Sequence, residues 1–225
     1  MNSRIAMALA CCALTSACGP IRVKPEPHLP HALLVPMPTK VGLVIGADLR
    51  GYLYKETRYG NDWEIALGPG HERLLHDVFG SEFAGVEEFH TLGAAQAASG
   101  LRAIFEPRIE QYSFVTSRET RGRYYAVTIR YRLNVYSPQG QQADSLIFTG
   151  YGTAQGSGAS DATSIELATR AAMRDAAAKF LVQFPEQPAG KKLSADEPIV
   201  VDTSVDTPVA PAGIEAVPID EVPPP

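Results

Sequence analysis

Cysteine is scarce in this sequence, and a long hydrophobic run is missing. Two of the three cysteines, Cys11 and Cys12, lie in an apolar run from Ile5 to Leu14. This run of about ten residues is too short to span a bilayer core, but it has the usual length of the apolar part of a signal peptide. The sequence therefore excludes a multispan membrane protein and leaves Cys18 without a disulfide partner in the mature chain.

Proline is nearly absent from the middle of the chain. Of the 18 prolines, six fall in residues 19–38, nine in residues 185–225 and only three in residues 39–184. A stretch of that middle length can bury roughly 68% of its unfolded surface, which is enough for a core. The distribution predicts one globular domain over 39–184 between two proline-rich segments, and it excludes collagen-like and coiled-coil proteins.

The residues before Cys18 resemble a targeting signal. The sequence Leu14-Thr-Ser-Ala17-Cys18 resembles a bacterial lipobox, in which a peptidase cuts between Ala17 and Cys18 after the thiol has received diacylglycerol. We therefore predict a signal peptide over 1–17 and a lipidated Cys18 that carries acyl chains such as palmitate. The alternative is ordinary secretory cleavage near Ala17, which would leave Cys18 as a free thiol.

The two flanking segments differ in character. Residues 18–38 favour extended polyproline geometry and predict a semi-rigid spacer that could reach about 60 Å from the bilayer. Residues 185–225 contain no aromatic residue and have eight acidic groups against two lysines, which predicts an acidic disordered tail. A second interpretation of the tail is a peptide that adds a strand to a partner's sheet, because Ile199-Val-Val and Val205 favour strands.

Strand patterns dominate the middle of the chain. Residues 124–136 alternate strictly, so that Tyr125, Ile129 and Leu133 face one side while Arg130 and Arg132 face the other. This is the pattern of an antiparallel strand with one face in the core. Shorter apolar runs predict further strands at 40–47, 51–58, 63–67, 86–90, 101–110 and 146–154.

Two main helices are expected. The segment 71–83 has apolar residues at helical spacing and predicts the first, whose end we expect near Phe79 because Gly80 interrupts the spacing. The second contains apolar residues at nearly helical spacing from Ile165 to Phe184, and its alanines would let it approach a sheet closely. The predicted fold is α+β, with a mostly antiparallel sheet, two main helices packed on one face and disordered proline-rich segments on both sides.

Motifs for catalysis or metal binding are incomplete. His71 and His76 are five residues apart, whereas a zinc-binding HExxH helix needs histidines at i and i+4. We expect both on the helix surface, without a metal. Gly150, Gly152 and Ser157 satisfy neither a phosphate-loop pattern nor a nucleophile elbow, so these glycines are expected to serve a tight connection. The sequence predicts no enzyme and no cofactor.

Arginines form the remaining candidate site. Six fall within 25 residues, interleaved with tyrosines. Behind a signal peptide, nucleic acid is not an expected partner, and the planar guanidinium suits phosphate and carboxylate groups. The candidate partners are lipid A, phospholipid heads or an acidic protein, and the alternative is the solvated face of a half-buried sheet. The arginines concerned are Arg108, Arg118, Arg121, Arg123, Arg130 and Arg132.

The whole pattern resembles small envelope lipoproteins of Gram-negative bacteria with a TolB-N-terminal-like α/β domain. These include the YajG-like lipoproteins, the auxiliary lipoproteins of ABC-type lipid transporters and, more distantly, LptE. The likeness covers about 39–184. It rests on the lipobox, the strand KVGLVIGADLR, the segment HERLLHDVFGSEFAGVEEF, the hairpin YYAVTIRYRLNVYSPQG…SLIFTGYG and the alanine-rich last helix. The segment GYLYKETRYGNDW and the acidic tail have no counterpart.

The resemblance implies a non-enzymatic accessory or scaffold component of an envelope assembly or transport machine. Its alternative is a transport accessory that binds lipid or lipopolysaccharide through the arginine-rich sheet face. Because Gly19 rather than aspartate follows Cys18, the sorting rule for such proteins favours the periplasmic face of the outer membrane. The expected partners are the membrane, reached through the lipid anchor, and an envelope protein.

Overall fold

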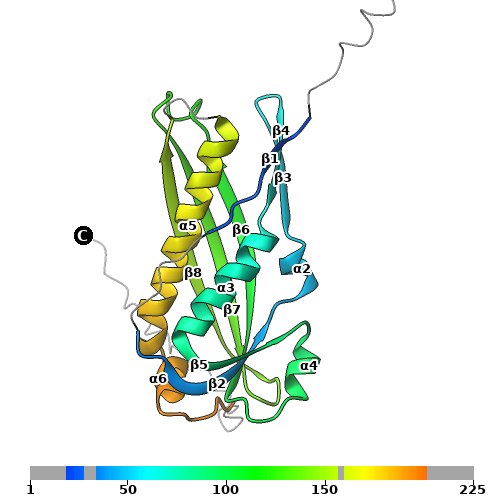
Figure 1. Ribbon diagram of the computed structural model, residues 1–225, viewed down its shortest axis with the longest axis vertical. Coiled ribbons are helices and arrows are strands. Elements are labelled where there is room, and N and C mark those ends of the chain that lie inside the picture. The colour runs from blue at the N-terminus through cyan, green and yellow to red at the C-terminus, as the bar shows by residue number, and fades with distance from the viewer. Residues whose placement is uncertain (1–18, 28–33, 157–159, 202–225) are drawn as a thin grey trace, which may run out of the picture.

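The computed structural model describes residues 19–27, 34–156 and 160–201, so the predicted signal peptide, Cys18 and Ser157 lie outside the described residues. Within these described ranges, two sheets and five α-helices make up the fold (Figure 1). The larger sheet has five strands in the order β5-β2-β6-β7-β8. Its strands are β2 (Met37–Val44), β5 (Phe83–Phe89), β6 (Ala103–Val115), β7 (Tyr124–Tyr136) and β8 (Gln142–Gln155).

Strand direction divides this sheet into two parts. Strands β5 and β6 both run parallel to β2, which lies between them. The long strands β6, β7 and β8 form an antiparallel meander, and the alternation predicted for 124–136 is realised in β7. The α+β prediction is confirmed, and the sheet is mixed because the connections through helices return the chain in parallel.

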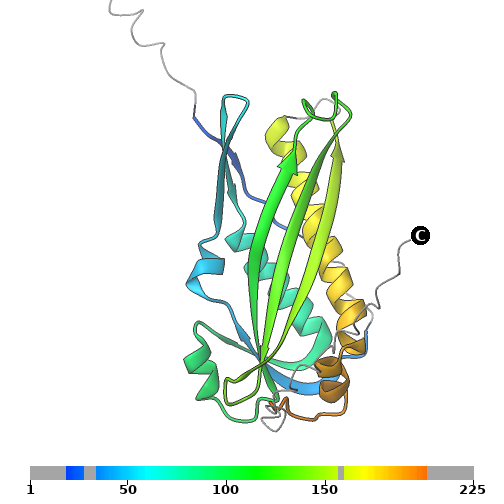
Figure 2. The same ribbon diagram turned by 180° about the vertical axis from the view of Figure 1, so that it is seen from behind.

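Two long helices cover one face of the five-stranded sheet (Figure 1). They are α3 (Gly68–Glu82) and α5 (Asp161–Gln183), as the sequence predicted. Between them and the sheet lies an aromatic core, in which the rings of Phe79 and Phe180 are 5.3 Å apart and those of Phe180 and Phe184 are 5.0 Å apart. Seen from behind, the long strands lie in front of both helices (Figure 2). The short helix α4 (Leu92–Gln96) packs through Ala95 beside Ile104 in a second small core.

Helix α3 continues through Gly80, where the sequence predicted its end. A Cβ at Gly80 would meet no atom within 4 Å, so this glycine occupies an exposed helical position. The cost of one exposed glycine in a helix is only about 1 kcal/mol, and the buried contacts of Phe79 and Phe83 on either side offset it.

The smaller sheet has three strands in the order β1-β4-β3. Strands β3 (Leu53–Arg58) and β4 (Asn61–Ala66) form a hairpin, and β1 (Ile21–Val23) runs parallel to β4. The short helix α2 (Ala47–Arg50) connects β2 to this hairpin. Strand β1 falls in the stretch predicted as a spacer, so residues 21–27 belong to the packed structure. Pro25 is buried here, and its carbonyl lies so close to Gly70 that a Cβ on Gly70 would approach it to 2.1 Å.

The packed structure also continues beyond residue 184. A 3-10 turn, η2 (Phe184–Glu186), leads into α6 (Pro188–Ser194), and Leu193 and Ile199 are buried. Both side-chain oxygens of Asp196 accept hydrogen bonds from Arg102, at 3.1 and 3.0 Å. Residues 185–201 are therefore part of the domain rather than of the predicted tail, whose remainder, 202–225, lies outside the described residues.

Candidate functional site

The six predicted arginines lie in two separate places. Arg108, Arg130 and Arg132 belong to β6 and β7, on the sheet face away from the long helices, where Arg108 stands directly opposite Arg132. Glu110 forms ion pairs with both Arg130 and Arg132, and Glu106 pairs with Arg108 at 2.8 Å. Two glutamates thus offset most of the charge of these three arginines, as expected for a solvated sheet face rather than an anion site.

Glu106 has several hydrogen-bond donors on that sheet face. Its carboxylate accepts hydrogen bonds from Arg108, from Asn134 at 3.2 Å and from Tyr136 at 2.9 Å. Burial alone would raise the pKa of Glu106, but these donors more than offset it and lower the pKa below its ordinary value. Glu106 is therefore charged at neutral pH and holds Arg108 at the surface.

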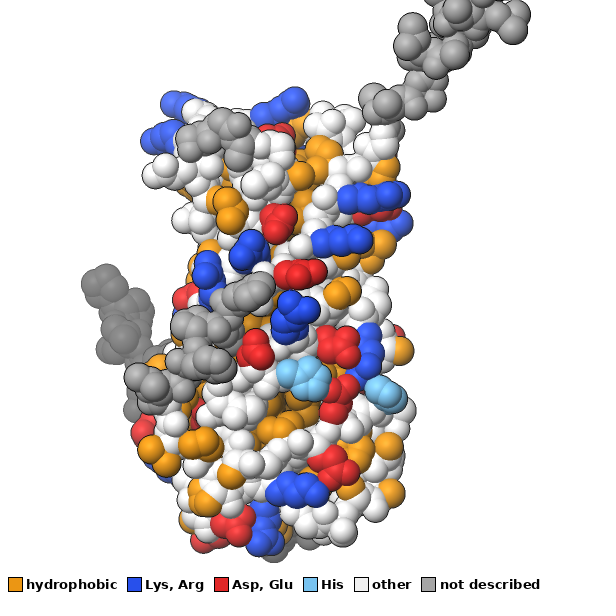
Figure 3. Space-filling model, viewed as in Figure 1, with side chains coloured by type: hydrophobic (Ala, Val, Ile, Leu, Met, Phe, Trp, Pro, Cys, Tyr) orange, Lys and Arg blue, Asp and Glu red, His pale blue; other side chains and the backbone are white. Residues whose placement is uncertain are grey.

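The other three arginines lie in the loop that connects β6 to β7. We call residues 116–123 the arginine loop; it carries Arg118, Arg121 and Arg123, all exposed. None of these three forms an ion pair with a described carboxylate. The guanidinium of Arg118 lies over the ring of Tyr59, 5.8 Å from its centre. Figure 3 shows Lys and Arg side chains at the end of the molecule where this loop lies.

Internal bonds hold the arginine loop in shape. Glu119 accepts from the backbone and hydroxyl of Thr116 and pairs with Arg58 of the β3–β4 hairpin at 2.9 Å. The hydroxyl of Thr120 donates to the carbonyl of Tyr124 and accepts from its amide. The loop and the hairpin tip therefore form one surface.

His71 was expected on the helix surface, but the structure places it in the core. It is 1% exposed, and its two ring nitrogens lie 2.7 Å from the carbonyl of Leu67 and 2.7 Å from the hydroxyl of Tyr131. Because a carbonyl only accepts, Nδ1 donates to Leu67 and Nε2 accepts from Tyr131. Burial lowers the pKa of His71 to about 4, although the bond to Leu67 acts in the opposite direction. The ring is therefore neutral at physiological pH.

A narrow apolar cleft opens beside this histidine, between α3, α5 and the sheet. Its lining includes Leu74, Val78, Phe148 and Phe180, and its volume is about 60 Å³. A single water needs roughly 10–15 Å³ measured in this way, so the cleft has room for a few waters or one small apolar group. The binding of a long acyl chain would require the two helices to separate.

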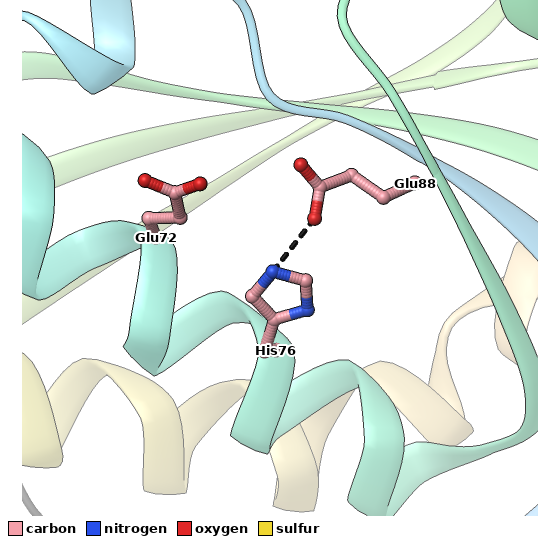
Figure 4. Close-up of side chains that lie close together, drawn as sticks. All are labelled: Glu72, His76 and Glu88. Carbon is pink, nitrogen blue, oxygen red and sulfur yellow. Dashed lines mark ion pairs between the residues drawn. The ribbon is translucent and has the colours of Figure 1, made fainter.

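A cluster that the sequence analysis missed lies on the outer side of α3. Glu72 and His76 are four residues apart on one helix face, and Glu88 of β5 points toward them (Figure 4). The ligand atoms of the three lie within 4.8 Å of one another, and Nε2 of His76 is 2.6 Å from Glu88. The i, i+4 spacing could have revealed the helical pair, but nothing in the sequence predicted that Glu88 would join it.

Arg50 already neutralises this cluster. Its guanidinium pairs with Glu72 at 3.2 Å and also with Glu88, while its Nε donates to the carbonyl of Ile45. A metal ion at the three ligands would have to displace that cation or share two carboxylates with it. The arrangement is therefore best described as an ion-pair network that connects α2, α3 and β5.

Two glycines of β8, the last strand of the meander, serve packing. A Cβ at Gly150 or Gly152 would lie 2.0 Å from a backbone oxygen of α5, that of Ala172 or Ala168 respectively. These glycines let α5 lie directly against β8, which explains the alanines on the facing side of α5. They are strand residues in the helix–sheet contact rather than parts of the tight connection that the sequence predicted.

In the described ranges, no helix is long and apolar enough to cross a membrane.

No family model and no curated protein matches the sequence. Among solved structures, a "putative lipoprotein" from Caulobacter crescentus shares 10% identity with a TM-score of 0.34, covering 54% of this chain and 79% of that one. A "putative neuraminyllactose-binding hemagglutinin homolog" from Helicobacter pylori shares 6% identity with a TM-score of 0.46, covering 75% of this chain and 96% of the other. Likenesses this low carry no argument about the function of this chain.

Proposed function

We propose that this chain is a lipoprotein anchored through Cys18 to the periplasmic face of the outer membrane. The observation that carries this proposal is the lipobox Leu14–Cys18, which ends in the only cysteine of the predicted mature chain. A lone thiol in an exported protein needs an explanation, and acylation supplies one. Stable anchoring requires more than one acyl chain, and a diacylglyceryl group provides two.

The anchored domain serves as a non-enzymatic accessory or scaffold component of an envelope assembly or transport machine. Its chemistry-bearing clusters support this role, because their groups already have internal partners. Tyr131 and Leu67 occupy both nitrogens of His71, and Arg50 bridges Glu72 and Glu88. A protein partner is expected to dock on the folded domain that the anchor holds at the membrane.

The first part of the test is mass spectrometry of the protein extracted from membranes of a Gram-negative host. The N-terminal peptide is expected to begin at Cys18 and to carry the mass of a diacylglyceryl group. The Cys18→Ser variant is the control, and it should be found in the soluble periplasmic fraction. A mature peptide with an unmodified Cys18 thiol would contradict the anchor.

The second part asks for the partner. In-cell crosslinking followed by purification of the anchored chain should recover one envelope protein in a fixed ratio, and Cys18→Ser should lose it. The alternative role, binding of lipid or lipopolysaccharide through the sheet-face arginines, has less support because Glu106 and Glu110 pair with them. Recovery of lipid alone, lost in Arg130→Glu/Arg132→Glu, would favour that alternative.

A further inference from the structure

The anchor, if Cys18 is acylated, is close to one end of the domain. Ile21 pairs with Trp63, and only Gly19 and Pro20 stand between Cys18 and strand β1. Three residues of extended chain span about 10 Å at most, so the domain has no long spacer on this side. Because β1 runs parallel to β4, its N-terminal end faces the tip of the β3–β4 hairpin, where β4 begins.

The arginine loop lies at the same end. Arg58 at the hairpin tip pairs with Glu119 of the loop and lies over the ring of Phe114, with 4.5 Å to the ring centre. Figures 1 and 2 show the hairpin tip and the β6–β7 connection side by side at one end of the molecule, with α6 at the other. A lipid on Cys18 would thus bring this end to the bilayer.

The charges at this end are arranged for an anionic surface. Arg118, Arg121 and Arg123 are exposed, whereas the carboxylate in the same loop, Glu119, is engaged with Arg58. Asp161, at the start of α5, is held by the hydroxyl of Tyr125. The three cations form no ion pair with a described carboxylate and can meet phosphate groups outside the protein, although Nε of Arg123 also donates to the carbonyl of Thr120. These two carboxylates bond inward.

Two tyrosines accompany the arginines. Tyr59 is 56% exposed at the hairpin tip, and Tyr124 is 41% exposed at the first residue of β7. Tyrosine rings prefer the headgroup level of a bilayer, where one side is apolar and the other is wet. Basic side chains near an anionic membrane surface each contribute about 1 kcal/mol of attraction.

The end of the described chain lies far from the arginine loop. The amide of Ile199 donates to the carbonyl of Arg102, just before β6 begins, and the arginine loop follows its last residue, Val115. The strand separates these points by roughly 40 Å. The chain after residue 201 contains five acidic residues and no basic one.

We propose that the arginine loop, together with Tyr59 and Tyr124, rests on the anionic phospholipid headgroups of the bilayer to which Cys18 is anchored. The inference rests on the proposed lipid anchor for its orientation. The anchor holds the domain near the surface, and the loop fixes which way the domain faces.

The test couples the chain from Cys18 onward to vesicles through a maleimide lipid, using its single thiol. Amide hydrogen exchange of residues 114–124 is compared between vesicles that contain phosphatidylglycerol and vesicles of phosphatidylcholine alone. Residues 188–196 at the far end serve as the internal reference. We expect slower exchange of the arginine loop only on phosphatidylglycerol, and loss of that protection at 0.5 M salt, where screening is strong.

The matched variants have the same change in charge at the two ends. Arg118→Glu/Arg121→Glu should reduce the protection at least about tenfold, since two attractive charges become repulsive. Lys191→Glu/Lys192→Glu in α6 should leave it unchanged, and Arg118→Lys/Arg121→Lys should retain it. Equal thermal melting of the variants verifies that each is folded.

Equal exchange of the loop on both kinds of vesicle, or equal effects of the two charge reversals, would overturn the inference. Because the anchor in this experiment is chemical, the result does not depend on acylation in the cell. A failure of the proposed function appears instead as an unmodified Cys18 in the mass spectrum.

Discussion

At the scale of single residues, the core contains two titratable groups, His71 and Glu82, whose neutral forms are favoured by burial. His71 donates to a backbone carbonyl and accepts from Tyr131, so its hydrogen-bonding capacity is used without a charge. Glu82, at the end of α3, is only 3% exposed, and burial raises its pKa to about 7. Both groups should therefore make the free energy of unfolding depend on pH.

His71 makes the fold sensitive to acid. Its pKa is about 4 in the folded chain and about 6.5 when unfolded, so the unfolded chain binds the extra proton between these values. Stability from this residue is complete above pH 6.5 and falls by up to about 3 kcal/mol as pH drops to 4. In urea unfolding, His71→Gln should lack this loss, whereas His76→Gln, which changes an exposed histidine, should keep it. The same acid dependence in both variants would contradict the assignment.

Glu82 has the opposite pH dependence. Its folded pKa of about 7 lies above the ordinary value of 4.5, so its neutral form stabilises the fold below pH 4.5 and this contribution is lost as pH rises through 7. Glu82→Gln resembles the neutral form and should raise the free energy of unfolding at pH 8 by about 2–3 kcal/mol, with little effect at pH 4.5. The exposed Glu197→Gln is the control. Equal gains at both pH values would show that burial of the charge is not the cause.

At the scale of elements, α5 lies in very close contact with β8. Gly152 leaves no room for a Cβ, because the carbonyl of Ala168 and the amide of Ala172 occupy its position. Gly152→Ala must push the helix away from the strand, and overpacking of this kind costs about 1–3 kcal/mol.

A matched glycine makes this contact testable. Gly80→Ala in α3 introduces the same methyl group into open space and should stabilise the helix by up to about 1 kcal/mol. Thermal unfolding should therefore shift down for Gly152→Ala and up for Gly80→Ala. A neutral effect at Gly152 would mean that α5 is not held against the strand as closely as described.

The elements that sequence predicted best are those whose pattern is local. The alternation of 124–136 follows from burial on one face, and the spacing from Ile165 to Phe184 follows from one helix on one sheet. The function of Gly152 could not be predicted, because its clash partner is 16 residues away in the chain. Likewise, His71 and Glu88 obtain their surroundings from β7 and α3, and no spacing within one element encodes such contacts. The six arginines are close together in the sequence but lie in two places in the structure. Three belong to strands β6 and β7, and the other three belong to the loop that connects these strands.

At the scale of the whole molecule, the domain is closed by the two segments that composition assigned to its exterior. Strand β1 extends the small sheet. Helix α6 packs against β2, and the amide of Ile199 bonds to the carbonyl of Arg102, just before β6. The proline distribution predicted that the domain ends at residue 184, and this boundary is too early. A proline in the first turn of α6 is compatible with the start of a helix rather than preventing it. Three of the nine prolines, Pro185, Pro188 and Pro198, fall within residues 185–201, where they are compatible with α6 and with the buried side chain of Ile199.

The C-terminal boundary yields the last prediction. A chain that ends at residue 184 loses the buried side chains of Leu193 and Ile199, each worth about 1.5–3 kcal/mol, and leaves the hydroxyl of Thr39 without the carbonyl of Leu193. It also loses the paired hydrogen bonds from Arg102 to Asp196. We expect its free energy of unfolding in urea to fall by at least about 4 kcal/mol.

A chain that ends at residue 201 is the matched control, because it keeps every one of these contacts and removes only the residues that follow them. Its unfolding midpoint should equal that of the full chain. If the chain ending at 184 unfolded at the same urea concentration, the packing of α6 would be peripheral and the domain would end where the proline distribution predicted. Unequal midpoints instead make residues 185–201 part of the folding unit, so that an acidic segment free to meet partners can begin only after the domain is complete.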